Sequence, residues 1–190
     1  MDRFVKKYVK SICWYLYGKT IRNPPLPYKV KSILFICKGN ICRSPFAEYI
    51  FSRKYNSFNR YLLYSAGINV TNPKSPPENA IITARKFGVD LQDHKSRSIK
   101  YSLVESNDII VATDTWQYNY LRKIFLEYRN KIFLLPLFDF NINSNFDCYY
   151  SYNIKDPYGA NAIEFEECYT KIERCLEGLF IKLIFNNFCE

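Results

Sequence analysis

Hydrophobic residues form four short, nearly unbroken runs along the chain, and between these runs they recur every three or four positions. Unbroken runs of this length are typical of strands that are buried on both faces of a parallel sheet. The runs predict strands at residues 32–36, 61–65, 108–112 and 131–135.

The stretches with helical spacing predict helices, and several of them have recognisable end signals such as a first-turn proline or a final glycine. The predicted helices run from Ser44-Pro45 until the pattern fades by Asn59, from Pro76-Pro77 to Phe87-Gly88, from Asp114 to about Arg129, and from Ile163 to Leu183.

Strands that alternate with helices imply an α/β fold, here a three-layer sandwich in which helices flank a four-stranded parallel sheet. In such folds, binding sites form at the carboxyl ends of the strands. Residues 136–155 are rich in Asn, Asp and Tyr, and we expect a long loop there without a helix or strand of its own. Loops of that length are often functional.

The length of 190 residues fits one folded domain, and no apolar run approaches the roughly 18 residues that a membrane-spanning helix needs. The net charge of +9 lies mostly in residues 1–30, which contain seven Lys or Arg and only one acidic residue. Nucleic-acid-binding proteins more often carry their basic residues across the folded body. No zinc-finger, RNP or helix-turn-helix pattern is visible, so nucleic acid is not an expected partner.

Residues 1–30 are expected to form a basic, amphipathic extension that ends in a Pro-rich linker at 23–27, ahead of a folded domain at 31–190. In residues 1–22 the apolar side chains recur with helical spacing and most lysines fall on the opposite side. This pattern predicts either a helix that lies on an anionic membrane surface or a helix that packs on the domain or a partner.

The chain has seven irregularly spaced cysteines and a single histidine, His94. The odd number of cysteines, and a start that does not separate basic from apolar residues as a signal peptide does, favour a reducing compartment. We therefore expect a cytoplasmic protein. Without a Cys-x2-Cys pair or a Cys/His cluster, no metal and no cofactor are expected. A Ser-His-Asp hydrolase lacks the Gly-x-Ser-x-Gly motif that would support it.

The segment from Cys37 to Ser44 reads Cys-x5-Arg-Ser and lies between the first predicted strand and the first predicted helix. Five intervening residues can curl so that backbone N–H groups point at an anion, and the helix N-terminus and Arg43 add positive charge. Gly39 and Asn40 are residue types that tolerate the positive φ angles of such a cradle. A buried cysteine is usually only a small hydrophobe, but in this setting Cys37 is predicted to be a nucleophile at a phosphate site.

Cleavage of a phosphate ester also needs a proton for the leaving group, and Asp156-Pro157-Tyr158 precedes the last predicted helix. Asp-Pro is commonly only a turn. A carboxylate held above the cradle, with an aromatic ring beside it, is however what general acid catalysis on phosphotyrosine requires. Asp156 is therefore the predicted acid.

The segment Ile33 to Pro45, ILFICKGNICRSP, resembles the signature of the low-molecular-weight protein tyrosine phosphatases. The resemblance covers about residues 31–185. Four further segments follow in that family's order: Ser65-Ala66-Gly67, Gly88 to His94, Asp108-Ile-Ile-Val and Asp156-Pro157-Tyr158-Gly159. The resemblance implies a four-stranded parallel sheet flanked by helices, and hydrolysis of phosphotyrosine through a phosphocysteine without a metal.

By this resemblance Cys37 is the nucleophile, Arg43 binds the phosphate, and Asp156 first donates a proton and later activates water. Ser44 helps to stabilise the thiolate leaving group. The substrate-binding residues implied by the resemblance are Lys38, Gly39, Asn40, Ile41, Cys42, Ser44 and Tyr158.

Asn40 resembles a strained loop residue that the family braces with a serine and a histidine, here Ser65 and His94. The alternative for His94 is a satisfied or solvated histidine without such a role. Cys42 resembles a second loop cysteine that can form a reversible disulfide with the nucleophile, and its alternative is an inert loop residue.

The chain departs from the family pattern at three places near the site. Lys38 stands where a hydrophobic residue is frequent, Thr113 replaces the usual methionine before Asp114, and Gly159 replaces a second tyrosine. Tyr158 is therefore the expected aromatic wall, in a pocket that is looser than usual.

Two other functions compete with phosphatase activity. Arsenate reductases on this fold relay oxidation through two further cysteines, and none lies between Cys42 and Cys148. A membrane adaptor that only binds phosphotyrosine would be expected to lack the nucleophile or the acid. The expected partner is a phosphotyrosine-containing protein; bacterial relatives suggest a tyrosine kinase of polysaccharide export.

Overall fold

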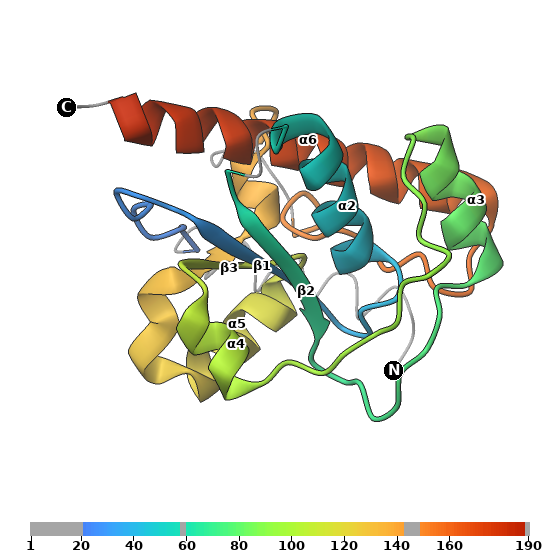
Figure 1. Ribbon diagram of the computed structural model, residues 1–190, viewed down its shortest axis with the longest axis horizontal. Helices are drawn as coiled ribbons and strands as arrows, with labels where there is room; N and C mark the ends of the chain where they lie inside the picture. Colours follow the sequence, from blue (N-terminus) through green and yellow to red (C-terminus); the bar gives the residue numbers. More distant parts are fainter. Residues whose placement is uncertain (1–20, 58–59, 143–148, 189–190) are drawn as a thin grey trace.

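The computed structural model describes residues 21–57, 60–142 and 149–188 (Figure 1). Its strands and helices alternate as the sequence predicts. In chain order they are β1 (Ser32–Cys37), α2 (Arg43–Tyr55), β2 (Leu62–Gly67), α3 (Glu78–Lys86), α4 (Tyr101–Ser106), β3 (Ile109–Ala112), α5 (Thr115–Ile124), β4 (Ile132–Leu134) and α6 (Ala162–Phe188), with 3-10 helices at Leu126–Lys131 and Leu135–Phe138.

The four strands form one parallel sheet with the order β2-β1-β3-β4. Helices α2, α3 and α6 cover one face of this sheet, and α4 and α5 cover the other (Figure 1). The predicted three-layer sandwich with a four-stranded parallel sheet is confirmed. The loop between β1 and α2 starts at the carboxyl end of a central strand, which is where ligands bind in open parallel sheets.

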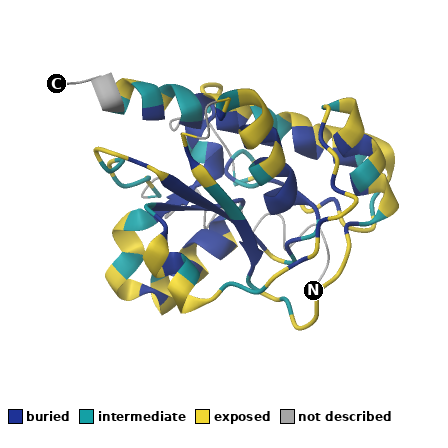
Figure 2. Cartoon of the chain, viewed as in Figure 1, coloured by how far each residue is buried: buried dark blue, intermediate teal, exposed yellow. Residues whose placement is uncertain are grey.

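Alternate residues of β1 supply two separate hydrophobic cores, because successive side chains of a strand point to opposite faces. Ile33 and Phe35 pack in the core under α2, α3 and α6, and Leu34 and Ile36 pack in the core under α4 and α5. All six residues of β1 are buried (Figure 2). Burial on both faces explains why the strand reads as an unbroken apolar run.

Aromatic stacking fixes α2 against the long helix α6. The rings of Phe46 and Tyr169 are nearly parallel, with their centroids 3.8 Å apart, and both residues are fully buried. Tyr169 is followed along the buried face of α6 by Ile172 and Leu176, at helical spacing. The first turn of α2, which carries Arg43, is therefore held rigidly to the core.

Three details of the predicted elements were wrong. Helix α4 was not predicted, because Val104 is its only buried residue and a single buried position gives no helical spacing of apolar residues. Helix α5, capped by Asp114 as predicted, ends at Ile124 rather than near Arg129, because the chain tightens into a 3-10 helix before β4. Residues 136–155 were predicted to contain no helix or strand, but residues 136–138 belong to the 3-10 helix Leu135–Phe138. This short apolar turn was not predicted because the rest of the segment is polar.

The Pro-rich segment lies on the domain rather than standing clear of it. The Asn23 side chain donates to Leu134 O and accepts from Leu134 N, so it pairs with the free edge of β4. Leu26 packs against the core under α2, and the Asn186 side chain donates to Pro27 O. The described part of this segment is therefore bound to the domain by side-chain hydrogen bonds and apolar packing.

The predicted amphipathic helix covers residues 1–22, of which residues 1–20 lie outside the described residues, so both of its alternatives stay predictions. Among the helices that the structure describes, none combines the length and the apolarity needed to span a membrane.

Candidate active site

The loop between β1 and α2 curls around the sulfur of Cys37. The backbone N–H of Asn40 donates to Cys37 Sγ at 3.1 Å, and the hydroxyl of Ser44 donates to the same atom at 3.1 Å. Cys37 is 2% exposed and is the last residue of β1. Two donors aimed at one sulfur, beside the N-terminus of α2, are the partners that a thiolate accepts.

Asn40 shapes this loop. It is the one non-glycine residue with a positive φ, 51°, in the part of the chain that the structure describes. Its side-chain amide donates to Ser44 Oγ at 2.9 Å and to Ser65 Oγ at 2.8 Å. Its backbone carbonyl accepts from His94 Nε2 at 2.9 Å. A fully buried side chain with this many partners can hold a left-handed conformation that few residues adopt.

His94 lies where the family resemblance places a bracing residue. It is 8% exposed, and burial lowers its pKa despite the hydrogen bond to Asn40 O, so the ring is neutral at pH 7. A neutral ring that donates from Nε2 leaves Nδ1 unprotonated. His94 therefore serves the loop as a fixed hydrogen-bond donor.

Two residues that were not predicted from the sequence, Glu48 and Arg97, extend this network. Glu48 accepts a hydrogen bond from Ser65 Oγ, and burial raises the pKa of its carboxyl. The backbone N–H of Arg97 donates to Asn40 Oδ1 at 2.9 Å, and its side chain donates to Ser65 O at 2.7 Å. Glu48 is the fifth residue after Arg43 and lies on the face of α2 that is directed toward β2. Its position on that helix is the sequence feature from which a contact with Ser65 could have been predicted.

Arg43 is 3% exposed and is held by three acceptors from two segments, one after β3 and one before α6. Its Nη1 donates to Asp114 Oδ2 and to Ile154 O, each at 3.1 Å, and its Nη2 donates to Asp156 Oδ2 at 2.6 Å. Burial acts to lower the pKa of Arg43, but the neighbouring Cys37, Asp156 and Asp114 raise it overall. Asp114 was predicted only as a helix cap, and it also fixes the guanidinium.

One donor of this guanidinium has no partner. Arg43 Nε is buried and makes no hydrogen bond with the protein. A buried N–H of a charged group is costly to leave unpaired, so its position indicates an acceptor that comes from outside the chain. An anion in the loop would supply that acceptor.

The loop opens into a pocket of about 290 Å³ that brings the predicted site residues together. Tyr158, 65% exposed, stands at its rim, and the segment after β2 adds residues that the sequence analysis did not single out, among them Asn69 and Lys74. The predicted residues on the lining are Cys37, Lys38, Gly39, Ile41, Cys42, Arg43, Asp156 and Tyr158, whereas Asn40, Ser44, Ser65 and His94 lie behind the loop.

The expected positive φ occurs at Asn40 but not at Gly39. The glycine whose missing side chain matters is Gly67, at the end of β2. A Cβ atom there would lie 2.9 Å from Asn40 N and 2.9 Å from Gly39 C. The loop can approach the sheet this closely only because residue 67 has no side chain.

Cys42 and Cys168 lie close to the site as neutral thiols. Burial, followed by the charge of Cys37, raises the pKa of Cys42 well above its usual range. Burial likewise raises the pKa of Cys168, on α6, to about 12. The sequence analysis did not place Cys168 near the loop, because more than 120 residues separate the two segments.

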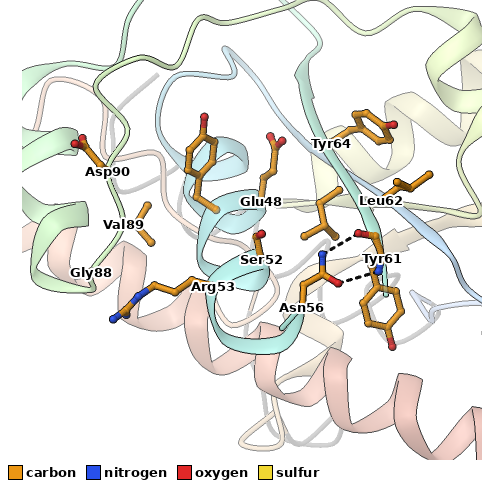
Figure 3. Close-up of a pocket in the computed structure, with 12 residues that line it drawn as sticks. Glu48, Ser52, Arg53, Asn56, Tyr61, Leu62, Tyr64, Gly88, Val89 and Asp90 are labelled. Carbon is orange, nitrogen blue, oxygen red and sulfur yellow. Dashed lines mark hydrogen bonds between the residues drawn. The ribbon is translucent and has the colours of Figure 1, made fainter. Parts of the chain in front are cut away.

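A second hollow lies between α2 and β2, with about 500 Å³ of space (Figure 3). Glu48, Tyr64 and Asp90 are on its lining, and the Asn56 side chain pairs with the backbone of Tyr61 beside it. Its lining has no cysteine and a single basic residue, Arg53, so the pocket at the loop is the stronger candidate for the reaction site. Within 21–57, 60–142 and 149–188 no group of three or more His, Cys, Asp and Glu is arranged to hold a metal ion.

A family model described as low molecular weight phosphotyrosine protein phosphatase matches residues 32–187. The chain belongs to this family. By family and homologues it is a low molecular weight protein-tyrosine phosphatase. The low molecular weight phosphotyrosine protein phosphatase of Sus scrofa is 30% identical over 160 residues, which cover 80% of this chain and 96% of that protein.

Two solved structures are similar as well. Vibrio vulnificus Wzb in complex with benzylphosphonate is 26% identical, with a TM-score of 0.66, over 81% of this chain and 99% of that one. The YwlE arginine phosphatase from Geobacillus stearothermophilus is 22% identical, with a TM-score of 0.70, over 82% of this chain and 94% of that one. The second likeness shows the fold alone.

The close approach at Gly67 predicts the outcome of a single added methyl group. In Gly67→Ala the new Cβ meets backbone atoms of the loop, so the loop must shift. We expect kcat/KM on an aryl phosphate to fall at least tenfold and Tm to fall by roughly 2–6 °C. The same Cβ would also lie 2.6 Å from Val70 Cγ2. In the double variant Gly67→Ala/Val70→Ala, the contact with Val70 is removed and the contact with the loop remains. Wild-type activity in this double variant would show that the contact with the loop is not the cause of the activity loss.

Proposed function

We propose that the chain hydrolyses phosphotyrosine in proteins through a phosphocysteine, with Cys37 as nucleophile, Arg43 as phosphate ligand and Asp156 as general acid and base. The observation that carries this proposal is the unpartnered, buried Arg43 Nε beside Cys37, in a pocket that Asp156 also lines. A tetrahedral anion over Cys37 is the partner that this donor lacks.

In the first step, Cys37 Sγ attacks phosphorus and the bond between phosphorus and the phenolic oxygen breaks. The electron pair goes to the leaving oxygen, and Asp156 supplies the proton. Asp156 is 41% exposed in its side chain and is paired with Arg43 Nη2 before substrate arrives. An incoming phosphate competes for that guanidinium and frees the carboxyl group to face the leaving oxygen.

In the second step, Asp156 takes a proton from water, the water oxygen attacks phosphorus, and the phosphorus–sulfur bond breaks. The departing sulfur receives its hydrogen bonds from Asn40 N and Ser44 Oγ, which stabilise the thiolate. Ser65 and His94 act by holding the loop in shape. Asn40 was predicted to bind the substrate, but it is fully buried and does not line the pocket, so its proposed role is also to hold the loop.

The pocket walls favour an aromatic phosphate over phosphoarginine. Ile41, Val70 and the exposed ring of Tyr158 offer apolar and aromatic surface beside Cys37. The charged rim residues other than Asp156 are Lys38 and Lys74, which disfavour the cationic group of an arginine. The benzylphosphonate bound by Vibrio vulnificus Wzb carries a phenyl ring next to its phosphonate, as a phosphotyrosine analogue would.

The rival functions lack support. An arsenate reductase needs a cysteine relay, and the described cysteines beyond Cys42 are Cys168 and Cys175, both buried in α6 with pKa values raised to about 12. A pure adaptor does not explain why a nucleophile and an acid line one pocket. That the partner is a tyrosine kinase of polysaccharide export, and that the protein is cytoplasmic, stay predictions.

Replacing the nucleophile tests the proposed function. In Cys37→Ser, turnover of p-nitrophenyl phosphate is expected to fall at least a thousandfold, because a serine hydroxyl is not ionised at neutral pH. Wild-type turnover is expected to persist in EDTA, since loop amides and Arg43 supply the positive charge. The control Cys175→Ser alters a buried cysteine outside the pocket and should keep its activity. Retained turnover in Cys37→Ser would contradict the proposal.

Leaving-group dependence tests the acid. Asp156→Asn should lower kcat on phosphotyrosine by about 10²–10⁴, but much less on p-nitrophenyl phosphate, whose leaving group needs no proton. Steady-state kinetics on both substrates gives the ratio. Asp90→Asn, an exposed carboxylate outside this pocket, serves as the control. An equal loss on both substrates would remove Asp156 from this role.

We also predict a reversible disulfide between Cys37 and Cys42. Peroxide oxidises the Cys37 thiolate to a sulfenic acid with loss of hydroxide, and the Cys42 thiol then displaces water to close the disulfide. Activity should return with dithiothreitol in the wild type, and recovery should be impaired in Cys42→Ser. Mass spectrometry that finds no bridge between these residues after oxidation would refute the pairing.

A further inference from the structure

A larger pocket, of about 650 Å³, adjoins the phosphate pocket and has no role in the steps above. The two pockets share Lys38, Arg43 and Asp156 on their linings. The adjoining pocket continues past Asp156 to Trp116 in the first turn of α5 and to Tyr150. A polypeptide whose phosphotyrosine occupies the phosphate pocket would therefore place its neighbouring residues here.

The charges on this lining are largely neutralised by one another. Arg43 is paired with Asp114 and Asp156, and Lys155 is paired with Glu164. The ammonium group of Lys171 donates to three backbone carbonyls of residues 150–153. The two other charged residues on the lining, Lys38 and Glu167, carry opposite charges, so the pocket has no strong preference for a charged ligand.

The large exposed side chains with apolar surface on this lining are aromatic. Trp116 is 48% exposed although it is a large apolar side chain, and Tyr150 is 47% exposed. The Trp116 ring stacks on Tyr120, with centroids 5.5 Å apart, which holds the indole in place. Exposed aromatic residues at a concave site are typical anchors for a partner's apolar side chain.

The wall opposite α5 is also held in place. The Asn153 side chain accepts from both the backbone N–H and the hydroxyl of Thr115, and Lys171 ties the same segment to α6. Tyr152 and Ile154 are buried in the two cores. The pocket is thus bounded by elements that are fixed before a substrate arrives, which lowers the entropic cost of binding.

We propose that this pocket is a specificity subsite, with Trp116 as its anchor, that receives a large apolar or aromatic side chain of the substrate close to the phosphotyrosine. The inference rests on the proposed function and names its substrate class: proteins in which the phosphotyrosine has such a neighbour. An extended peptide advances about 3.3 Å per residue, so residues within three positions of the phosphotyrosine reach an adjoining pocket.

The test uses phosphotyrosine peptides with alanine at every other position, and phenylalanine introduced singly from three positions before to three positions after the phosphotyrosine. In the wild type, phenylalanine at one or two positions should raise kcat/KM about tenfold, as expected from burying one large apolar side chain. Trp116→Ala should abolish this gain and leave p-nitrophenyl phosphate turnover within twofold. Trp116→Phe, which keeps a ring, should retain most of the gain.

Phe185→Ala is the matched control, because Phe185 is also an exposed aromatic residue but lies about 30 Å along α6 from Glu164. Titration of the same peptides into Cys37→Ser gives the preference without turnover, and Tm of each variant reports folding. Turnover of p-nitrophenyl phosphate reports the proposed function alone, so its absence in the wild type would overturn that function and not the peptide preference.

Three results would overturn the subsite. The first is a flat response to phenylalanine at all six positions in the wild type, and the second is a preference that Trp116→Ala leaves unchanged. The third is a concentration-dependent dimer that Trp116→Ala abolishes while peptide preference is unaffected, which would assign the surface to a second copy of the chain.

Discussion

The active site depends on the conformation of one buried residue, Asn40. The φ of 51° at Asn40 turns the loop so that the Asn40 backbone N–H points at Cys37 Sγ. Hydrogen bonds from four neighbours to the amide and carbonyl groups of Asn40 stabilise this conformation: they are Ser44, Ser65, His94 and Arg97. The loop is therefore shaped before a phosphate arrives. Preorganised donors of this kind cost no rearrangement during the reaction, which is why they are effective in catalysis.

The sheet supplies the base on which this loop rests. Parallel β1 and β2 end side by side, with Cys37 paired in register with Gly67, so the proposed nucleophile and the glycine that the loop packs on are neighbours. On the other side, Asp114 follows β3 and fixes Arg43. Three strand ends thus position the sulfur, the loop and the guanidinium, while Asp156 arrives on a segment that leads into α6.

Much of this arrangement could be predicted from the sequence, because local patterns encode it. The four strands are unbroken apolar runs, and Cys-x5-Arg between a strand and a helix fixes the position of the phosphate loop. The sequence did not reveal the long-range partners. Glu48, Arg97 and Gly67 act on Asn40 only after folding, and Trp116 meets the pocket only where α5 packs beside residues 149–156.

We propose that Asn40 builds the anion site without contacting the anion. Isothermal titration of inorganic phosphate into the wild type, Asn40→Gly and Asn40→Ala measures this directly. Glycine permits the positive φ but makes none of the side-chain hydrogen bonds. Alanine disfavours the positive φ and also makes none of these hydrogen bonds. We expect the affinity for phosphate to be lower in Asn40→Gly than in the wild type, and to be lowest in Asn40→Ala, by at least tenfold relative to the wild type. Both variants are expected to fold. Wild-type phosphate affinity in Asn40→Ala would contradict this proposal.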